Sequence, residues 1–120
     1  MEAKLSKYCR EIDTLELKRL VEEKLSKIAP TMEHVRNLIL DAKLLLRILL
    51  DEDFELEEEA KKDFTCALLY FVENKDSIPD SIPIIGLWDD YKVIRFVKEK
   101  HKEEIKRYFE STPHFIANYF

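Results

Sequence analysis

Residues 31–50 read TMEHVRNLILDAKLLLRILL, and this stretch decides the fold class of the chain. Its polar side chains fall on one narrow stripe of a helix, and apolar side chains occupy the rest of the helix surface. The polar positions are Glu33, Arg36, Asn37, Asp41, Lys43 and Arg47. A helix of this kind must be covered on several sides, whereas a helix on a membrane surface has a broader polar face. We therefore expect residues 31–50 to form the buried central helix of a bundle.

Helical patterns also flank the central stretch. Residues 2–28 predict a helix with a break near Asp13, because the apolar stripe changes phase there and Asp13 with Glu16 fits a capping box. Residues 55–73 predict another helix, whose first turn is acidic and suits the positive N-terminal end of the helix dipole. A last helix is expected from Asp89 or Asp90, acting as its N-cap, to about residue 110.

Composition supports the same fold class. The chain has 120 residues, of which 46% are hydrophobic and 38% charged, with a single glycine, Gly86. Sheets joined by tight turns need more glycine than this, and helices do not. We expect one all-α domain over residues 1–120, a compact bundle of four to five helices. The net charge of −5 argues against binding to nucleic acid through phosphate contacts, so no nucleic-acid partner is expected.

The cysteines and the first residues bear on the compartment. Cys9 and Cys66 lie far apart and have no metal-type spacing, so we interpret them as free thiols of a reducing compartment. The N-terminal residues lack the apolar run of a signal peptide, and no stretch is long and apolar enough to span a membrane. These observations together predict a cytoplasmic protein.

An irregular loop is expected between the last two helices. Residues 74–90 read NKDSIPDSIPIIGLWDD, and their prolines bias Ile78 and Ile82 toward extended conformations. Gly86 permits a turn in the same stretch. We expect the large apolar side chains of this loop to turn mostly inward and to seal the bundle.

Residues 67–94, ALLYFVENKDSIPDSIPIIGLWDDYKVI, resemble the core motif of the YkvA-like family. The matching positions are Ala67, Leu68, Tyr70, Asp76, Ile78, Pro79, Asp80, Ile82, Pro83, Gly86, Asp89 and Asp90. The resemblance implies a bacterial or archaeal helical domain of unknown function and supplies no reaction. Two departures are Glu73-Asn74 in place of Ser-Pro, and Ser77 and Ser81 in place of bulky apolar residues. Some relatives look membrane-associated, and the serines disfavour that association for this chain.

Four aspartates are the candidate site residues: Asp76, Asp80, Asp89 and Asp90. If the loop folds back on itself they could converge on a divalent cation such as magnesium, which prefers oxygen ligands. The favoured interpretation is structural, with Asp76 and Asp80 in Asx-type turns and Asp89 or Asp90 as a helix cap. Trp88 stands beside them as a candidate partner contact.

Other catalytic or cofactor chemistry finds little support. His101 and Glu104 share a helix face, but the chain has no Glu-x-x-His motif of the kind that di-iron bundles require. No cysteine or serine is marked as an activated nucleophile, and a single glycine cannot build a phosphate-binding loop. No catalytic residue and no cofactor are assigned. We expect a non-enzymatic protein-interaction or scaffold module; the alternatives are a metal-dependent hydrolase or ligand binder and, less favoured, a peripheral membrane protein.

Overall fold

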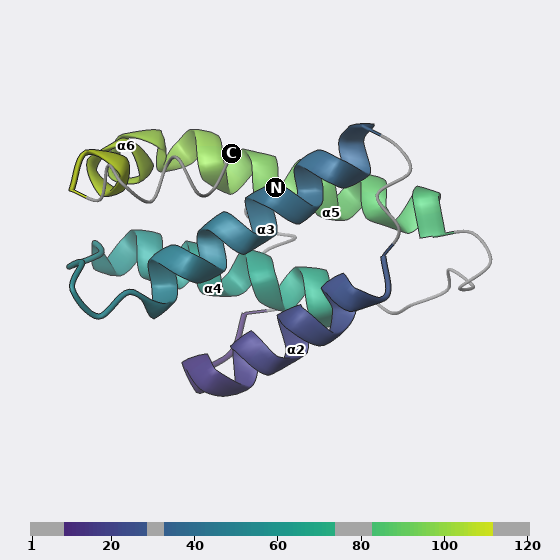
Figure 1. Cartoon of the computed structure of the whole chain (residues 1–120), viewed down its shortest axis with the longest axis horizontal. Helices are drawn as coiled ribbons and strands as arrows, with labels where there is room; N and C mark the ends of the chain where they lie inside the picture. Colours follow the sequence, from purple (N-terminus) through teal and green to yellow (C-terminus); the bar gives the residue numbers. More distant parts are fainter. Residues whose placement is uncertain (1–8, 29–32, 74–82, 112–120) are drawn as a thin grey trace.

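The computed structural model describes residues 9–28, 33–73 and 83–111, with the backbone alone for residue 73 and residues 83–89. These ranges contain five α-helices and no β-strand. In chain order the helices are α2 (Thr14–Ser26), α3 (Glu33–Leu50), α4 (Glu58–Glu73), α5 (Pro83–Lys100) and α6 (Lys102–Ser111). They pack as a bundle in which α3 and α4 lie between α2 and α5 (Figure 1). The predicted all-α bundle of four to five helices is confirmed.

The central position predicted for α3 is confirmed by its contacts and burial. This helix touches α2, α4 and α5, so side chains on three of its sides are covered. Its buried side chains are His34, Val35, Leu38, Ala42, Leu44, Leu45, Leu46 and Ile48. Leu40 lies on the remaining side, where 40% of its surface is exposed. The narrow polar stripe of the sequence thus matches the one direction in which α3 meets solvent.

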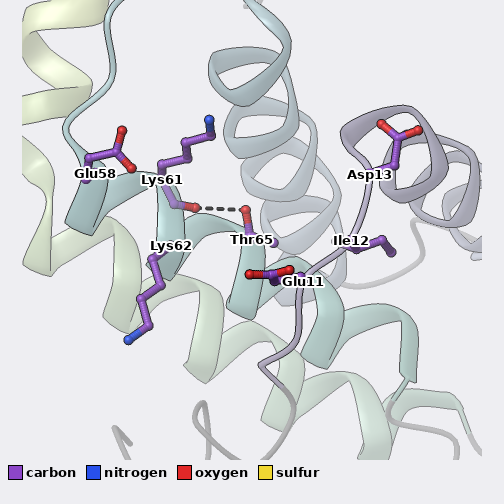
Figure 2. Close-up of a pocket in the computed structure, with 7 residues that line it drawn as sticks. All are labelled: Glu11, Ile12, Asp13, Glu58, Lys61, Lys62 and Thr65. Atoms are coloured by element: carbon purple, nitrogen blue, oxygen red, sulfur yellow. Dashed lines mark hydrogen bonds between the residues drawn. The ribbon is translucent and has the colours of Figure 1, made fainter.

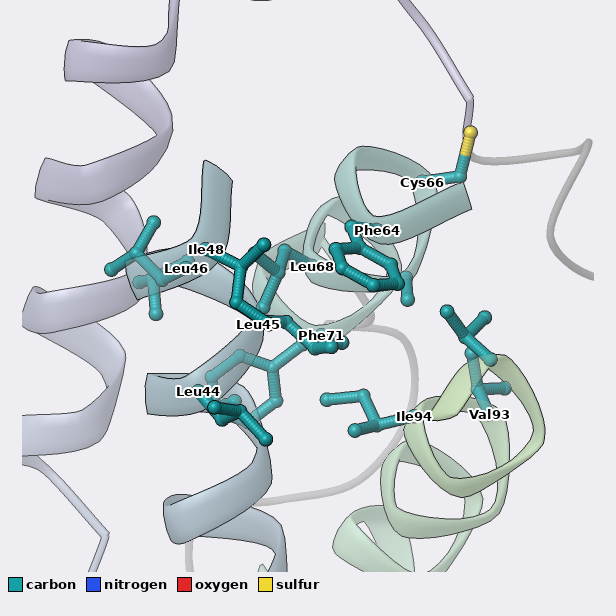
Figure 3. Packing of buried hydrophobic residues seen from close by; sticks show 14 of the residues in the cluster. Leu44, Leu45, Leu46, Ile48, Phe64, Cys66, Leu68, Phe71, Val93 and Ile94 are labelled. Carbon is teal, nitrogen blue, oxygen red and sulfur yellow. The ribbon is translucent and has the colours of Figure 1, made fainter. Parts of the chain in front are cut away.

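α4 is buried on more of its sides than the sequence pattern predicted. Of the side chains predicted to face inward from residues 55–73, Ala60, Phe64, Ala67, Leu68 and Phe71 are fully buried, whereas Leu56, which precedes α4, is only partly buried. Cys66, Leu69 and Tyr70, on other sides of the helix, are buried as well. Figure 3 shows the core where side chains of α3 and α4 meet Val93 and Ile94 of α5. The second half of α4 is therefore surrounded by the bundle.

The predicted break near Asp13 is confirmed, whereas the helix expected before it is absent from residues 9–13. These residues are not helical, and α2 begins at Thr14 with Asp13 as its N-cap. The Asp13 carboxylate accepts a hydrogen bond from the backbone N–H of Leu15 at 3.2 Å. This bond satisfies one of the free donors at the start of the helix, which fixes where α2 begins.

The irregular loop predicted for residues 74–90 is wrong in its second half. Residues 74–82 lie outside the described ranges, but α5 begins at Pro83 and runs through Gly86. Proline is well accommodated in the first turn of a helix, because its missing N–H has no partner there in any case. Asp89 and Asp90 consequently lie about two turns inside α5. The prediction that one of them is the N-cap of this helix is wrong.

The last predicted helix is divided in two at His101. α5 ends at Lys100 and α6 begins at Lys102, and Figure 1 shows α6 turned away from the direction of α5. Helical hydrogen bonds continue across the division, from the N–H of His101 to Val97 at 3.0 Å and from the N–H of Ile105 to His101 at 3.1 Å. The division is therefore a bend in a nearly continuous helical segment.

α6 is attached to the acidic segment that precedes α4. The guanidinium of Arg107 donates to the carbonyl of Glu55 at 2.5 Å and lies 4.3 Å from the centre of the Phe54 ring. Glu104 accepts from both Arg107 and the backbone N–H of Glu57. These contacts hold the segment that connects α3 to α4 against α6. Among the helices that the structure describes, none is long and apolar enough to cross a membrane.

The prediction of two free thiols is wrong, because Cys9 and Cys66 form a disulfide. Their Cα atoms are 4.7 Å apart although 57 residues separate them in sequence. The sequence spacing gave no sign of this pairing, since it arises only when residues 9–13 lie along α4. In the chain-entropy description, a cross-link that closes a loop of this length stabilises the fold by about 4 kcal/mol.

The burial pattern predicts a large contrast between two leucines. Leu45 is fully buried, whereas 68% of the Leu15 surface is exposed. Leu45→Ala should lower the free energy of unfolding by about 2–5 kcal/mol, since it removes buried surface and leaves a cavity. Leu15→Ala, the matched control, should change it by less than about 0.5 kcal/mol. Urea titration followed by circular dichroism measures both; similar losses for the two variants would contradict the assigned core.

Candidate functional site

Only one of the four candidate aspartates has a described side chain. Asp76 and Asp80 lie outside the described residues, as do the side chains of Asp89 and Trp88. Asp90 is described and is buried, with 1% of its surface exposed. Asp90 is therefore the candidate aspartate whose surroundings the structure describes.

Asp90 lies next to the ammonium group of Lys24, which reaches it from α2. Lys24 Nζ is 3.6 Å from Oδ2 of Asp90. The same nitrogen donates a hydrogen bond to the carbonyl oxygen of Phe71 and lies 4.6 Å from the centre of the Phe71 ring. The Phe71 carbonyl belongs to the last turn of α4, where helical carbonyls lack intrahelical partners. One ammonium group thus connects α2, α4 and α5; we call this the Lys24 clamp.

Charge compensation explains why these groups lie together. A buried carboxylate is costly unless an opposite charge or several hydrogen bonds compensate it. The side chain of Lys24 is 26% exposed, so its ammonium can retain some water while it neutralises Asp90. It also opposes the negative end of the α4 dipole. The clamp therefore stabilises two negative groups with one positive charge.

α3 has a similar pair with α5. Lys98 Nζ is 2.7 Å from Oδ1 of Asp41, and both side chains are largely buried. Burial raises the pKa of Asp41 above its ordinary value of 3.8, and the hydrogen bond and charge of Lys98 offset this only in part. The pair therefore joins the helices at some desolvation cost to its carboxylate.

α4 makes the third such connection, through Asp63. The Oδ2 atom of Asp63 lies 2.6 Å from Nε2 of His101 and 3.0 Å from Nζ of Lys100. Burial alone would raise the pKa of Asp63, but the hydrogen bonds and charges of His101 and Lys100 outweigh it, and the pKa lies below 3.8. The ring of His101 also packs edge-on against Phe64. This cluster lies where α5 bends into α6.

A surface groove of about 700 Å³ lies on the other side of α4 (Figure 2). Its lining residues are Glu11, Ile12, Asp13, Glu58, Lys61, Lys62 and Thr65. One wall is the non-helical segment 9–13, which we call the strap, and the other is the first half of α4. The Cys9–Cys66 disulfide fastens the strap to α4 beside Thr65. The groove therefore exists only while the strap lies on α4.

The chemistry of these clusters is that of ion pairs within the fold. Among residues 9–28, 33–73 and 83–111, no group of three or more His, Cys, Asp or Glu side chains is arranged to hold a metal ion. The Asp63–His101 pair has the geometry of a base and its orienting carboxylate, but His101 is only 8% exposed.

The sequence interpretation did not identify Lys24 or Asp63 as important residues. Both are charged residues on an otherwise apolar helix face: Lys24 follows Leu17 and Val21 at helical spacing, and Asp63 adjoins Ala60 and Phe64. A charge on such a face is the available signal, because a buried charge requires a partner. The sequence does not identify the partner of such a charge, since Asp90 is 66 residues away from Lys24.

The two aspartates paired with lysines predict opposite dependences of stability on pH. Because the pKa of Asp63 is lowered in the folded state, its contribution is present above the unfolded pKa and is lost as pH falls through the folded value. The pKa of Asp41 is raised, so its contribution is present at low pH and is lost as pH rises through the folded value.

Asp63→Asn should therefore lower the free energy of unfolding by about 2 kcal/mol at pH 7, with a smaller difference from wild type near pH 3. Asp41→Asn, which also removes a lysine-paired carboxylate, should cost less than half as much at pH 7. Urea unfolding at pH 7, 5 and 3 measures both variants. Equal losses with the same pH dependence would show that the assigned pKa directions are wrong.

The part of this chain that is similar to known sequences runs from the middle of α4 into α5. A family model described as a protein of unknown function (DUF1232) matches residues 64–95. This range runs from the middle of α4 into α5 and includes Phe71 and Asp90, two of the three residues of the Lys24 clamp. No curated protein and no solved structure matches the chain. Residues 64–95 are thus similar to a domain family of unknown function, which confirms the resemblance expected for residues 67–94.

Proposed function

We propose that the chain is a non-enzymatic protein-interaction or scaffold module that presents residues 74–90 to a protein partner. The observation that carries the proposal is the Lys24 clamp. Phe71 lies just before this segment and Asp90 is its last residue, so Lys24 binds the chain at both ends of the segment. Tethered ends restrict the conformations of the segment between them. Less conformational entropy is then lost when a partner binds it.

The use of charge inside the bundle supports the same proposal. Lys24, Asp41 and Asp63 each pair with a group in α5 or next to it, and each pair joins two helices. These charges have structural partners and hold the framework together. A rigid framework around a short specific segment is the arrangement expected of a recognition module. Trp88, inside the presented segment, is the proposed partner contact, because tryptophan is enriched among residues that dominate binding energy.

The second candidate is a metal-dependent hydrolase or ligand binder that uses Asp76, Asp80, Asp89 and Asp90. The feature in its favour is the density of carboxylates in the segment of the doubled Ile-Pro motif. The feature against it is the neighbourhood of Asp90, whose carboxylate lies beside the Lys24 ammonium. A cation bound by Asp90 would be repelled by that ammonium. We therefore favour the interaction module over metal chemistry, and no cofactor is proposed.

We propose the cytoplasm as the compartment, although the free-thiol argument for it no longer holds. Disulfides are rare in the cytosol of mesophiles, but they are common inside cells of hyperthermophiles. The chain has 38% charged residues, no glutamine and only three asparagines. This composition is typical of hyperthermophile proteins, which are rich in charge and poor in thermolabile amides. A cytoplasmic protein of such an organism would combine this composition with a disulfide. Peripheral membrane association is the weakest candidate.

Photo-crosslinking tests the proposed partner site. A photoreactive phenylalanine analogue in place of Trp88 should give a discrete adduct in cells that express the protein natively. The partner identified in the adduct is then purified for binding measurements. Lys24→Met, which removes the charge but keeps the stem, should weaken binding of the wild-type chain by about ten-fold, since the segment is no longer tethered.

Lys27→Met is the matched control, because Lys27 lies on the same helix and, among the residues that the structure describes, pairs with Glu23 in an exposed ion pair. It should leave the partner affinity within about two-fold, as exposed pairs contribute little. Lys24→Met should also lower the free energy of unfolding by about 2 kcal/mol, because Asp90 loses a compensating charge. Equal affinity for the two variants, or no adduct at position 88, would contradict the proposal.

Calorimetric titration separates the two candidate functions. Magnesium, calcium and manganese should each give no saturable heat with the wild-type chain, since Lys24 disfavours a cation at Asp90. Asp90→Asn should give the same flat result. A micromolar site in the wild type that disappears in Asp76→Asn and Asp90→Asn would favour the metal-dependent alternative instead.

A further inference from the structure

The solvent-facing side of α3 is basic, although the chain as a whole carries a net charge of −5. After Glu33 in the first turn, the exposed residues of α3 are Arg36, Leu40, Lys43 and Arg47. Their spacing of three and four residues places them on one stripe of the helix. From Arg36 to Arg47 this stripe is about 16 Å long, or three turns, and it carries no carboxylate.

α2 and α6 show the usual arrangement of exposed charges, in which opposite signs lie three or four residues apart. Glu23 of α2 lies 3.5 Å from Arg19 and also 3.5 Å from Lys27, at the end of the same helix. On α6, Arg107 lies 2.8 Å from Glu104. Pairs of this kind stabilise a helix slightly, because the opposite charges attract each other.

The stripe of α3 has like charges instead. Lys43 and Arg47 are four residues apart, a spacing at which like charges destabilise a helix slightly. Arg47 interacts with Tyr108 of α6. Within the described ranges, neither Arg36 nor Lys43 forms an ion pair. A departure from the rules of helix stability without a compensating contact is expected at a functional surface.

Arg95 extends this stripe onto α5. α3 and α5 run in the same direction (Figure 1), and the Asp41–Lys98 pair joins residues that are 57 apart. With the same offset, Arg95 lies level with position 38 of α3. Its exposed guanidinium donates a hydrogen bond to the hydroxyl of Tyr91 at 2.6 Å, which fixes its position without neutralising its charge. We call this surface the basic face; its residues are Arg36, Leu40, Lys43, Arg47 and Arg95.

We propose that the basic face binds an acidic segment of another protein, in which an apolar side chain lies between carboxylates. Arginine and lysine bind carboxylates through charge-assisted hydrogen bonds, and one guanidinium can donate two of them. Leu40, which is 40% exposed in the middle of the face, provides the apolar contact. The inference does not rest on the proposed presentation of residues 74–90, so either can fail without the other.

Other occupants fit the basic face less well. Nucleic acid and anionic lipid would both be repelled by the net charge of −5, and a membrane also requires a wider apolar surface than one leucine. A second copy related by a two-fold axis at Leu40 would bring Arg36 of one copy next to Lys43 of the other, because the axis pairs position 36 with position 44. These like charges would repel each other. An acidic protein segment meets none of these obstacles.

Fluorescence anisotropy with a designed peptide tests the basic face. The probe is a labelled helical peptide of about 14 residues, with a central leucine and with glutamates three and four positions to either side of it. The control peptide has glutamine in place of each glutamate. The purified chain should bind the glutamate peptide with a micromolar Kd, at least about ten-fold tighter than the glutamine peptide. Its affinity should fall as the salt concentration rises, because salt screens the attraction.

Charge-removing variants locate the binding to this surface. Arg36→Gln combined with Lys43→Gln should weaken binding of the glutamate peptide by at least about ten-fold. Its melting temperature should not fall, since neither side chain has an ion pair to lose. Lys61→Gln combined with Lys62→Gln is the matched control, because it removes the same charge from exposed positions on α4. It should leave the affinity within about two-fold.

Three kinds of result would overturn the proposal. No binding of the glutamate peptide, equal affinity for the two peptides, or equal losses in the two double variants would show that the basic face is not a specific site. An oligomer in sedimentation equilibrium that is lost in the Arg36→Gln, Lys43→Gln variant would make a second copy the occupant. Co-sedimentation with vesicles of phosphatidylcholine and phosphatidylserine, lost in the same variant, would make a membrane surface the occupant.

Discussion

The ammonium group of Lys24 is the point at which three helices of this protein meet. It faces the buried carboxylate of Asp90 on α5 and the last-turn carbonyl of Phe71 on α4, while its own backbone belongs to α2. This positive charge offsets part of the cost of burying the Asp90 carboxylate, and it thereby helps to hold the first half of α5 against α2 and α4.

Local features of the fold were predictable from the sequence because they depend on neighbouring residues. The narrow polar stripe of α3 and the N-cap at Asp13 require only helical periodicity and one side chain of the right type. Pro83 was misinterpreted because proline suits both a loop and the first turn of a helix, and nothing nearby distinguishes the two. The resemblance over residues 67–94 could be found because its motif is continuous in sequence.

Features that join distant parts of the chain could not be predicted in this way. Cys9 and Cys66 pair only because the strap lies along α4, and their separation of 57 residues carries no information about that path. The candidate site shows the same limit. Asp90 was singled out from its motif, but its burial and its partner Lys24 depend on the packing of α2 against α4. Charged residues on apolar helix faces were the one sign of these pairings, and they indicate that a partner exists without naming it.

The position of α5 after α2, α3 and α4 in the chain has a consequence for how the protein is made. Each of the three preceding helices contributes a charged group whose partner lies in residues 90–101: Lys24, Asp41 and Asp63. During synthesis α2, α3 and α4 leave the ribosome first, so these groups emerge without their countercharges and must stay hydrated. A nascent chain that ends before α5 can form helices and collapse loosely, but it cannot bury these residues. The native core therefore closes only after residue 101 has left the exit tunnel, and until then the apolar faces of α3 and α4 are available to chaperones.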